Sequence, residues 1–320
     1  MTLTPGTFDL PLSPVGLGCN NFGRAGTLTA EQAGVAAVIH TAIDSGVTLF
    51  DTADLYGASF GGSEEMMGAA LGRRRDEIVL ATKWGHPAAP PMYTGERGSR
   101  LFIRASVEAS LTRLRTDRID LYQMHRPDSE TPIAETLLAL DELVREGKVR
   151  FIGHSGFSVE QIAEAARVAD ELGCVSFVTG QDELSLVNRG IDRDIGPELR
   201  RLGLGLLPYF PLANGLLTGK FTRDHFPADS RIMRQRPHLA EQADWDALDA
   251  YRALCDEWGV TMLEATFGWM LEHEPVSSVI AGATKPEQVR QNAAAGEAFR
   301  PDAEQCAQIE ALFPVTAAAE

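Results

Sequence analysis

The strongest constraint on the fold is a regular alternation of short apolar runs and helix-forming segments along most of the chain. Runs such as Val-Ser-Phe-Val at 175–178 and Leu-Gly-Leu-Leu at 204–207 are apolar on both faces, which is typical of buried parallel strands. The residues that end successive runs recur about every thirty positions, the length of one β-α-β unit, and they are Asp51, Lys83, His125, Ser155, Gln181 and Tyr209. The pattern predicts an α/β chain with a parallel sheet.

The boundaries of the expected elements follow from these runs and from turn and capping residues. We expect strands at 15–18, 47–51, 78–83, 119–125, 149–153, 175–179, 204–207 and 276–280. We expect helices at 29–45, 63–71, 101–114, 132–146, 159–172, 197–202, 244–258, 263–272, 286–295 and 302–312. Thr29 with Gln32, and Thr284 with Glu287, have the spacing of a capping box, and the pieces at 7–14 favour a hairpin. No linker separates these elements, so we expect one domain over 1–320.

Composition and charge narrow the class of protein. With 44% hydrophobic and 23% charged residues, the chain is typical of soluble globular proteins. A formal net charge of −16 argues against nucleic acid and anionic membranes as partners, since both reward a basic surface. We therefore expect a small-molecule partner, and the oligomeric state stays open.

Cysteine spacing and the amino terminus carry further expectations. The four cysteines are scattered without CxxC spacing and form no cluster with histidines, so neither a metal site nor a disulfide framework is indicated. The amino terminus lacks the pattern of a signal peptide, and no apolar run approaches the roughly 20 residues of a membrane span. A cytoplasmic location is therefore expected.

Four side chains with complementary chemistry stand at or just after strand ends. They are Asp51, Tyr56, Lys83 and His125. One reaction that such a set would suit is reduction of a carbonyl by hydride, which yields an alkoxide and needs a proton donor within hydrogen-bond reach. The reference pKa of tyrosine is about 10, and we expect the Lys83 ammonium, held by Asp51, to lower the pKa of Tyr56. His125 would orient the carbonyl oxygen and stabilise its developing charge.

These residues and their order resemble the aldo-keto reductase superfamily, whose catalytic tetrad is an Asp and a Tyr five residues apart, then a Lys and a His. The Thr-Lys-Trp around Lys83 and the Met-His-Arg-Pro around His125 are similar to family signatures. The resemblance covers nearly the whole chain and implies a single (β/α)8 TIM barrel, with a hairpin that plugs its bottom and extra C-terminal helices. It implies reversible reduction of an aldehyde or ketone, with Tyr56 as the proton donor.

The resemblance also implies a nicotinamide cofactor. Gly153-His154-Ser155-Gly156-Phe157 is similar to the family's Gly-x-Ser-Asn-Phe, with Gly156 in place of the Asn that binds the carboxamide. Basic side chains at three positions that the family uses around the phosphates, Lys220, Arg231 and Lys285, favour NADP(H) over NAD(H). The implied cofactor-binding residues are Ser155, Gln181, Tyr209, Pro211, Leu212, Lys220, Arg231, Gly282, Thr284, Lys285, Gln288 and Asn292.

The substrate pocket is expected beside these residues. By position it is lined by Asn21, Leu55, Trp84 and Arg126, with Trp84 as an aromatic face for the substrate. The breaker-rich loop 85–99 would form one wall, and long loops inside compact domains are usually functional. Arg97 and Arg126 are candidates for binding an anionic group.

Two other functions stay open. A lysine at a barrel strand end can form a Schiff base with a carbonyl, so Lys83 also suits an aldolase. The branch of the superfamily that this chain resembles is also close to the channel-associated β subunits. A cofactor-sensing regulatory subunit with little turnover is therefore the second alternative.

Overall fold

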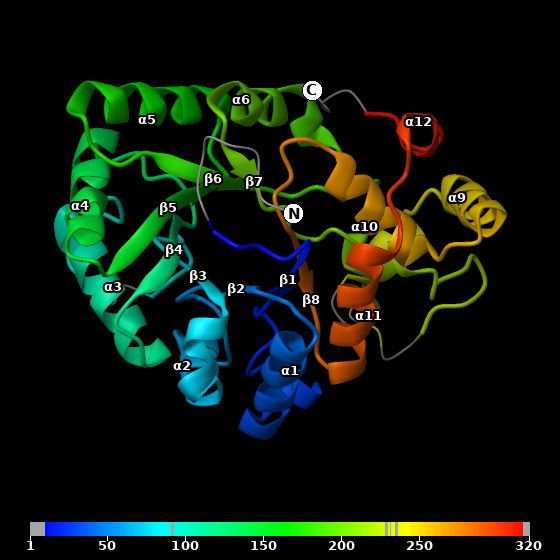
Figure 1. Ribbon diagram of the computed structural model, residues 1–320, viewed down its shortest axis with the longest axis horizontal. Coiled ribbons are helices and arrows are strands. Elements are labelled where there is room, and N and C mark those ends of the chain that lie inside the picture. The colour runs from blue at the N-terminus through cyan, green and yellow to red at the C-terminus, as the bar shows by residue number, and fades with distance from the viewer. Residues whose placement is uncertain (1–9, 91–92, 228–229, 231, 234–235, 316–320) are drawn as a thin grey trace.

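A parallel eight-stranded barrel forms the centre of the molecule (Figure 1). The structure is a computed structural model and describes residues 10–90, 93–227, 230, 232–233 and 236–315. The strands are β1 (Val15–Gly18), β2 (Leu49–Asp51), β3 (Val79–Trp84), β4 (Ile119–Met124), β5 (Val149–Ser155), β6 (Phe177–Gln181), β7 (Gly205–Leu206) and β8 (Val279–Gly282). They pair in the order β7-β6-β5-β4-β3-β2-β1-β8. Backbone hydrogen bonds of Leu206 with Pro275 and Ser277 join the two ends of the sheet, so the predicted (β/α)8 barrel is confirmed.

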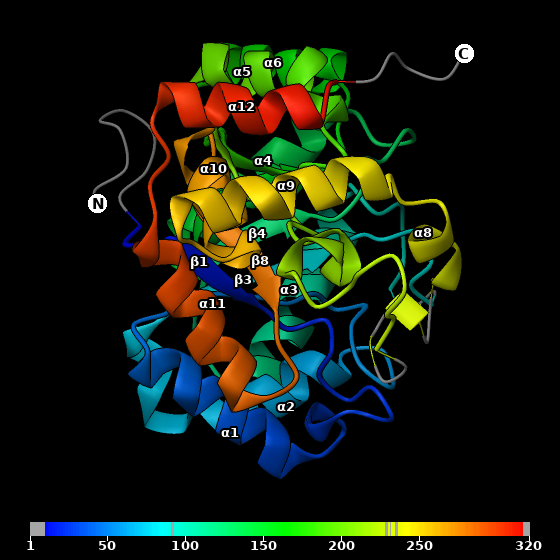
Figure 2. The same ribbon diagram turned by 90° about the vertical axis from the view of Figure 1, so that its right-hand side faces the viewer.

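Helices follow the strands and cover the outside of the barrel (Figure 1). They are α1 (Gln32–Asp44), α2 (Gly62–Leu71), α3 (Arg100–Leu114), α4 (Ile133–Arg145), α5 (Val159–Leu172), α6 (Ile195–Leu202), α10 (Met262–Glu272) and α11 (Pro286–Ala298). The short α8 (Pro237–Glu241) precedes α9 (Trp245–Trp258), and α12 (Ala303–Leu312) ends the series. Helix α9 packs against both α10 and α12 outside the barrel (Figure 2). None of the helices in the described ranges is long and apolar enough to cross a membrane.

The start of α1 differs from its prediction. Its N-cap is Glu31, which makes no side-chain capping bond, so the capping box of Thr29 with Gln32 is wrong. Thr29 is instead fully buried and donates a hydrogen bond from Oγ1 to the carbonyl oxygen of Asn21 at 3.1 Å. The hydroxyl therefore ties the loop after β1 rather than the helix end, a competing use of a short polar side chain.

Only part of the segment for which a hairpin is expected lies within the described residues, and that part does not form a hairpin. Residues 7–9 lie outside the described residues, and 10–14 contain no strand. Leu10 is nevertheless 3% exposed, because it packs in an inner apolar cluster with Leu49, Val79, Ala81, Leu121, Leu207 and Ile280. Ser13 N–H donates to Thr48 Oγ1 at 2.7 Å. This segment therefore closes the end of the barrel at which the strands begin.

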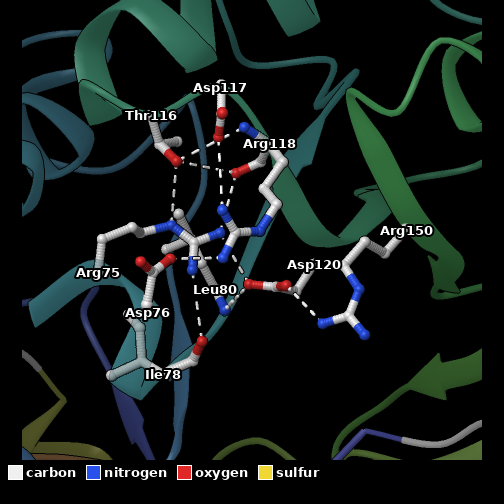
Figure 3. Close-up of polar contacts among 9 residues, drawn as sticks. All are labelled: Arg75, Asp76, Ile78, Leu80, Thr116, Asp117, Arg118, Asp120 and Arg150. Carbon is white, nitrogen blue, oxygen red and sulfur yellow. Dashed lines mark hydrogen bonds and ion pairs between the residues drawn. The ribbon is translucent and has the colours of Figure 1, made fainter.

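A network of charged side chains reinforces the same end of the barrel (Figure 3). Asp120 Oδ2 accepts hydrogen bonds from Arg75 Nη2 at 2.7 Å and from the backbone N–H of Leu80 at 2.9 Å. Its Oδ1 accepts from Arg150 Nη1 at 3.0 Å. Arg75 also donates to the carbonyl oxygen of Arg118. The bottom of the barrel is thus closed by apolar packing and paired charges, which leaves the opposite rim for a site, as in other TIM barrels.

Candidate active site

The four residues of the predicted tetrad converge at the carboxyl-terminal rim. Asp51 ends β2, Lys83 lies in β3, His125 directly follows β4 and Tyr56 lies in the loop after β2. Lys83 Nζ donates to both carboxylate oxygens of Asp51, at 2.8 and 2.7 Å, and to the carbonyl oxygen of Thr52 at 2.8 Å. The lysine side chain is fully buried. Its ammonium is therefore fixed in position by three oxygens.

The Tyr56 ring lies over that ammonium and contacts the ring of His125. Lys83 Nζ lies 5.2 Å from the centroid of the Tyr56 ring. The rings of Tyr56 and His125 meet edge to face, with centroids 5.6 Å apart. Parallel strands bring their carboxyl ends to one rim, which is why residues separated by more than seventy positions in sequence meet here.

Charge and burial set the protonation states of two of these groups. Burial is the largest single influence on the pKa of Lys83 and would lower it, but the charge and hydrogen bonds of Asp51, together with Tyr56 and Cys19, raise that pKa above its ordinary value. Burial raises the pKa of Tyr56, and Lys83 offsets the rise only in part, because Asp51 and Tyr209 add to it. Lys83 does act to lower the pKa of Tyr56, as expected, but burial outweighs it and leaves that pKa above the value of free tyrosine. Tyr56 keeps its proton at neutral pH.

His125 is neutral in the same range. Burial and the nearby charge of Lys83 lower its pKa to about 2. Its Nδ1 is buried and has no hydrogen-bond partner among the described residues. His86, from the loop after β3, packs on it with ring centroids 4.7 Å apart. His86 was not predicted as a site residue from the sequence. Its place just after the strand that carries Lys83 could have indicated it.

Gln181 and Gln123 hold Asp51 from the other side. Gln181 Nε2 donates to Asp51 Oδ1 at 3.0 Å and to Gln123 Oε1 at 3.3 Å. Gln123 Nε2 also donates to Asp51 Oδ1, at 3.3 Å. The predicted cofactor ligand Gln181 thus has its amide nitrogen engaged within the barrel. Gln123 was missed, although its place two residues before His125 puts it on the same face of β4.

The residues expected beneath the cofactor occupy the next strand ends. Ser155, buried at the end of β5, pairs in register with Gln181 at the end of β6. Tyr209 follows β7, and its backbone N–H donates to the carbonyl oxygen of Asp182 at 3.0 Å. Pro211 is buried and Leu212 half-buried in the loop after Tyr209. These positions all lie on the rim that carries the tetrad.

The loop after Tyr209 has an unusual backbone that the sequence did not signal. Phe210, Ala213 and Asn214 have φ values of 55°, 46° and 58°, a region that non-glycine side chains rarely adopt. Asn214 Oδ1 is buried and lacks a hydrogen-bond partner among the described residues. Backbone strain of this kind clusters at ligand-binding segments. The segment contains a 3-10 helix at Ala213–Thr218.

The residues expected near the cofactor phosphates lie around the start of α11 and in the loop before α8. Lys220 and Lys285 are exposed and Asn292 is half-buried, while Arg231 lies outside the described residues. The N-cap of α11 is Lys285, so the predicted capping box of Thr284 with Glu287 is wrong. Gln288 Oε1 instead accepts the backbone N–H of Thr284 at 2.8 Å.

The rim residues predicted for substrate contact divide into two groups. The prediction that Trp84 forms a wall of the pocket is wrong, because its side chain is fully buried. Its ring stacks on that of Tyr122 with centroids 4.4 Å apart, and its Nε1 donates to the carbonyl oxygen of Arg97. Arg97 is itself bound to the carbonyl oxygens of Gly85 and Pro127, which makes it an anchor of the 85–99 loop.

The other predicted contacts remain near the rim. Asn21 is largely buried and packs close to Gly282. A Cβ added to Gly282 would stand only 3.1 Å from Asn21 Nδ2. Leu55 and Arg126 are half-buried. Arg126 makes no hydrogen bond or ion pair within the part of the chain that the structure describes. No group of three or more metal-ligating side chains occurs within that same part.

A buried lysine-carboxylate pair, a protonated tyrosine and a neutral histidine at the carboxyl ends of barrel strands define the class as a TIM-barrel enzyme site. The sequence model of the Aldo/keto reductase family matches residues 14–313. The chain belongs to that family, and the resemblance noted in the sequence is confirmed.

Individual relatives are similar over most of the chain. L-glyceraldehyde 3-phosphate reductase of Escherichia coli strain K12 is 32% identical over 313 residues, 94% of this chain and 88% of that protein. A probable voltage-gated potassium channel subunit beta of Arabidopsis thaliana is 35% identical over 268 residues, 80% of each chain. The NADH-specific methylglyoxal reductase of Escherichia coli strain K12 is 34% identical over 309 residues, 91% of each chain. Together with the family, the two reductases support an oxidoreductase.

Proposed function

We propose that this protein reduces an aldehyde or ketone to the alcohol with NADPH, and that the reaction is reversible. The observation that carries the proposal is the buried Lys83-Asp51 pair beside the face of the Tyr56 ring, with the ring of a neutral His125 in edge-to-face contact with Tyr56. The nicotinamide, when bound, supplies the hydride. Unpartnered buried polar atoms at the rim, among them Asn214 Oδ1 and Asp182 Oδ2, fit a polar ligand there.

Each member of the tetrad has a separate task in this proposal. Tyr56 donates the proton to the alkoxide oxygen as it forms, and its raised pKa keeps the proton available until then. Neutral His125 donates a hydrogen bond to the carbonyl oxygen and so orients it. Lys83 stabilises the tyrosinate that remains, and Asp51 holds the lysine in place. Gln123 and Gln181 are positioning residues for Asp51.

The structure disfavours the aldolase alternative. A Schiff base requires a neutral, accessible amine, whereas Lys83 is fully buried and its pKa is held above the ordinary value. All three ammonium donors already face oxygens of Asp51 and Thr52. A regulatory subunit with little turnover stays the second candidate, because one relative is a probable channel subunit.

The experiment that separates the two candidates is turnover on a panel of aldehydes and ketones, with consumption of NADPH as the readout. A reductase gives saturable turnover with at least one carbonyl, and that turnover disappears in Tyr56→Phe. Tight NADPH binding with no turnover on any carbonyl would instead favour the regulatory subunit.

Preference for NADPH over NADH is the finer part of the proposal, and the relative named as NADH-specific makes it worth testing directly. A charge-assisted contact to the 2′-phosphate contributes roughly 1.5 to 3 kcal/mol, so a pair of them gives a hundredfold preference or more. We expect Arg231→Ala and Lys285→Ala to weaken NADPH binding much more than NADH binding. Equal losses for both cofactors would place these cations at the shared pyrophosphate or away from the ligand.

A further inference from the structure

Asp54, a buried acid in the loop that carries Tyr56, makes no ion pair with any residue that the structure describes. It is 1% exposed, and its Oδ1 is buried without a hydrogen-bond partner among those residues. Glu64, in the first turn of α2, is a second acid and is fully buried. Its Oε1 accepts from Thr82 Oγ1 at 2.6 Å and its Oε2 from Arg113 Nε at 2.7 Å. Of the two acids, Glu64 therefore holds the arginine.

The other groups around Asp54 leave its charge uncompensated as well. The titratable and charged side chains that act on this cluster are Glu64 on α2, Lys83 on β3, Arg113 on α3, Tyr122 on β4 and Tyr93 in the 85–99 loop. Both cations in this set are already bonded to other acids, Asp51 and Glu64. Tyr122 Oη is buried without a hydrogen-bond partner in the described part of the chain. An ionised Asp54 is therefore a buried charge without a bonded partner, which is costly.

The Asp54 carboxyl group consequently holds its proton more tightly than an ordinary aspartic acid. Burial is the largest influence and the charge of Glu64 the next, and together they raise the pKa of Asp54 to about 7. The opposing effects of Arg113, of the backbone N–H of Leu55 and of Lys83 are each smaller. Free aspartic acid has a pKa of about 3.9. The group therefore changes its charge near neutral pH, with the neutral form favoured below pH 7.

Main-chain hydrogen bonds tie Asp54 to two residues of the tetrad. Its N–H donates to the carbonyl oxygen of Lys83 at 3.1 Å, and its own carbonyl oxygen accepts the N–H of Gly61 at 2.6 Å. Two residues further, the carbonyl oxygen of Tyr56 accepts the N–H of Ser63 at 2.9 Å. Tyr56 thus lies in a short loop that is anchored at Asp54 and at the start of α2. A displacement of Asp54 is therefore passed on to the phenol.

We propose that Asp54 is a positioning residue of the reductase site: its neutral carboxyl group keeps the loop of Tyr56 in place, and loss of its proton in mildly alkaline solution displaces that loop and slows the reaction. The ionised carboxylate is repelled by Glu64 and turns toward water, taking the loop with it. A shift of a reacting group by about 1 Å costs up to about a hundredfold in rate. The inference rests on the proposed reduction of a carbonyl.

The first measurement concerns the proton alone and does not depend on turnover. It is the denaturant midpoint of unfolding of the parent and of Asp54→Asn between pH 5 and pH 9. The folded chain keeps the Asp54 proton up to about pH 7 and the unfolded chain only up to about pH 4, so the parent loses stability as the pH rises between these values. Asp54→Asn should therefore gain on the parent from pH 5 to pH 7, and the gain should stay constant above pH 8. The same difference at every pH would overturn the inference.

The second measurement is kcat with NADPH and a saturating carbonyl between pH 6.5 and pH 8.5. In the parent, kcat should fall by roughly twentyfold, which is the fall in the neutral fraction of an acid with a pKa of about 7. Asp54→Asn is neutral at every pH, so its kcat should change by less than about twofold. Asp76→Asn, at an exposed carboxylate that pairs with Arg118 at the other end of the barrel, is the control and should reproduce the parent profile.

Glu64→Gln gives a check of direction. It removes the charge that raises the pKa of Asp54 and frees Arg113 to pair with that carboxylate, so the fall in kcat should begin at a lower pH than in the parent. A fall that begins at the same or a higher pH would overturn the inference.

Two further outcomes would overturn the role of Asp54. One is a parallel fall in kcat for the parent and Asp54→Asn, which would mean that another group titrates. The other is a folded Asp54→Asn chain that is slow at every pH, since the amide keeps the neutral state. A parent chain without turnover on any carbonyl would instead overturn the proposed function, and with it the positioning role, even where the unfolding midpoints follow the expected course.

Discussion

The hydroxyl of Tyr56 is the group on which the proposed chemistry depends. We expect Tyr56→Phe to lower kcat by roughly 10²- to 10⁴-fold, the range for loss of a positioned general acid. The cofactor dissociation constant should stay near that of the parent, since the ring and its contact with His125 are kept. Steady-state kinetics and a cofactor titration measure the two effects. Turnover within a fewfold of the parent would transfer the acid role to a water molecule or to His125.

Asp51 has a structural task besides its catalytic one, because Lys83 is a fully buried ammonium. We expect Asp51→Asn to reduce the free energy of unfolding by roughly 3 to 5 kcal/mol, the cost of leaving one partner of a buried ion pair uncompensated. Denaturant unfolding at neutral pH measures it. The double variant Asp51→Asn, Lys83→Met should recover part of the loss. If the double variant is less stable than Asp51→Asn, the buried charge is not the cause.

At the scale of the element, alternation along a strand decides which residues reach the site. In β3, Lys83 faces the interior and bonds Asp51, while the next residue, Trp84, stacks on Tyr122. In β5, Ser155 pairs in register with Gln181, whereas His154 packs among Phe157 and Phe177. Successive strand side chains point to opposite faces. Applied strictly, that rule would have removed Trp84 from the predicted pocket.

His154 provides the test at this scale. Both ring nitrogens are buried without hydrogen-bond partners among the described residues, and burial lowers its pKa to about 3. The unfolded chain, with a histidine pKa of about 6.5, then binds more protons than the folded chain between these values. Above pH 6.5 the titration of His154 does not reduce the free energy of unfolding. Below pH 6.5 that free energy falls progressively as the pH falls toward 3.

We therefore expect His154→Leu to be more stable than the parent, and increasingly so in acid. Between pH 7.5 and pH 5 the difference in unfolding free energy should grow by roughly 2 kcal/mol, from the 1.5-unit interval below pH 6.5. Denaturant unfolding at both pH values measures it, with the exposed His238→Leu as the matched control. A constant difference between the two pH values would mean that the buried imidazole gains a partner.

At the scale of the whole molecule, the two ends of the barrel have different tasks. Asp51, Tyr56, Lys83 and His125 occupy the carboxyl-terminal rim. The Asp120 network (Figure 3) and Leu10 close the other end. A hollow of about 800 Å³ also opens on that lower face. Three of the cations that line it, Arg75, Arg118 and Lys148, are paired with carboxylates. The arrangement separates stability from activity, as in other TIM barrels.

This separation predicts that Asp120→Asn affects stability alone. Its side chain still accepts the N–H of Leu80 but leaves the charge of Arg75 unpaired, at a cost of roughly 3 kcal/mol. Denaturant unfolding should show the loss, while kcat/KM at low temperature stays that of the parent. The exposed pair Arg118-Asp76 provides the control, and Asp76→Asn should leave the unfolding midpoint unchanged. A large fall in kcat/KM for Asp120→Asn would mean that the two ends are coupled.

The sequence by itself determined the order of strands and helices and the positions of Asp51, Lys83 and His125 at strand ends. Those features depend on local periodicity and on turn residues, which each segment carries in its own composition. Because parallel strands present their carboxyl ends at one rim, order along the chain was sufficient to predict a shared site.

Only the tertiary structure decided which side chains meet within that site. The bonds of Gln123 and Gln181 to Asp51, and the place of Arg126 over Gly156, join different strands. So does the burial that raises the pKa of Tyr56 above that of free tyrosine. Burial, hydrogen-bond partners and charge separation are set by neighbours that lie far apart in sequence, and periodicity within one segment holds no information about them.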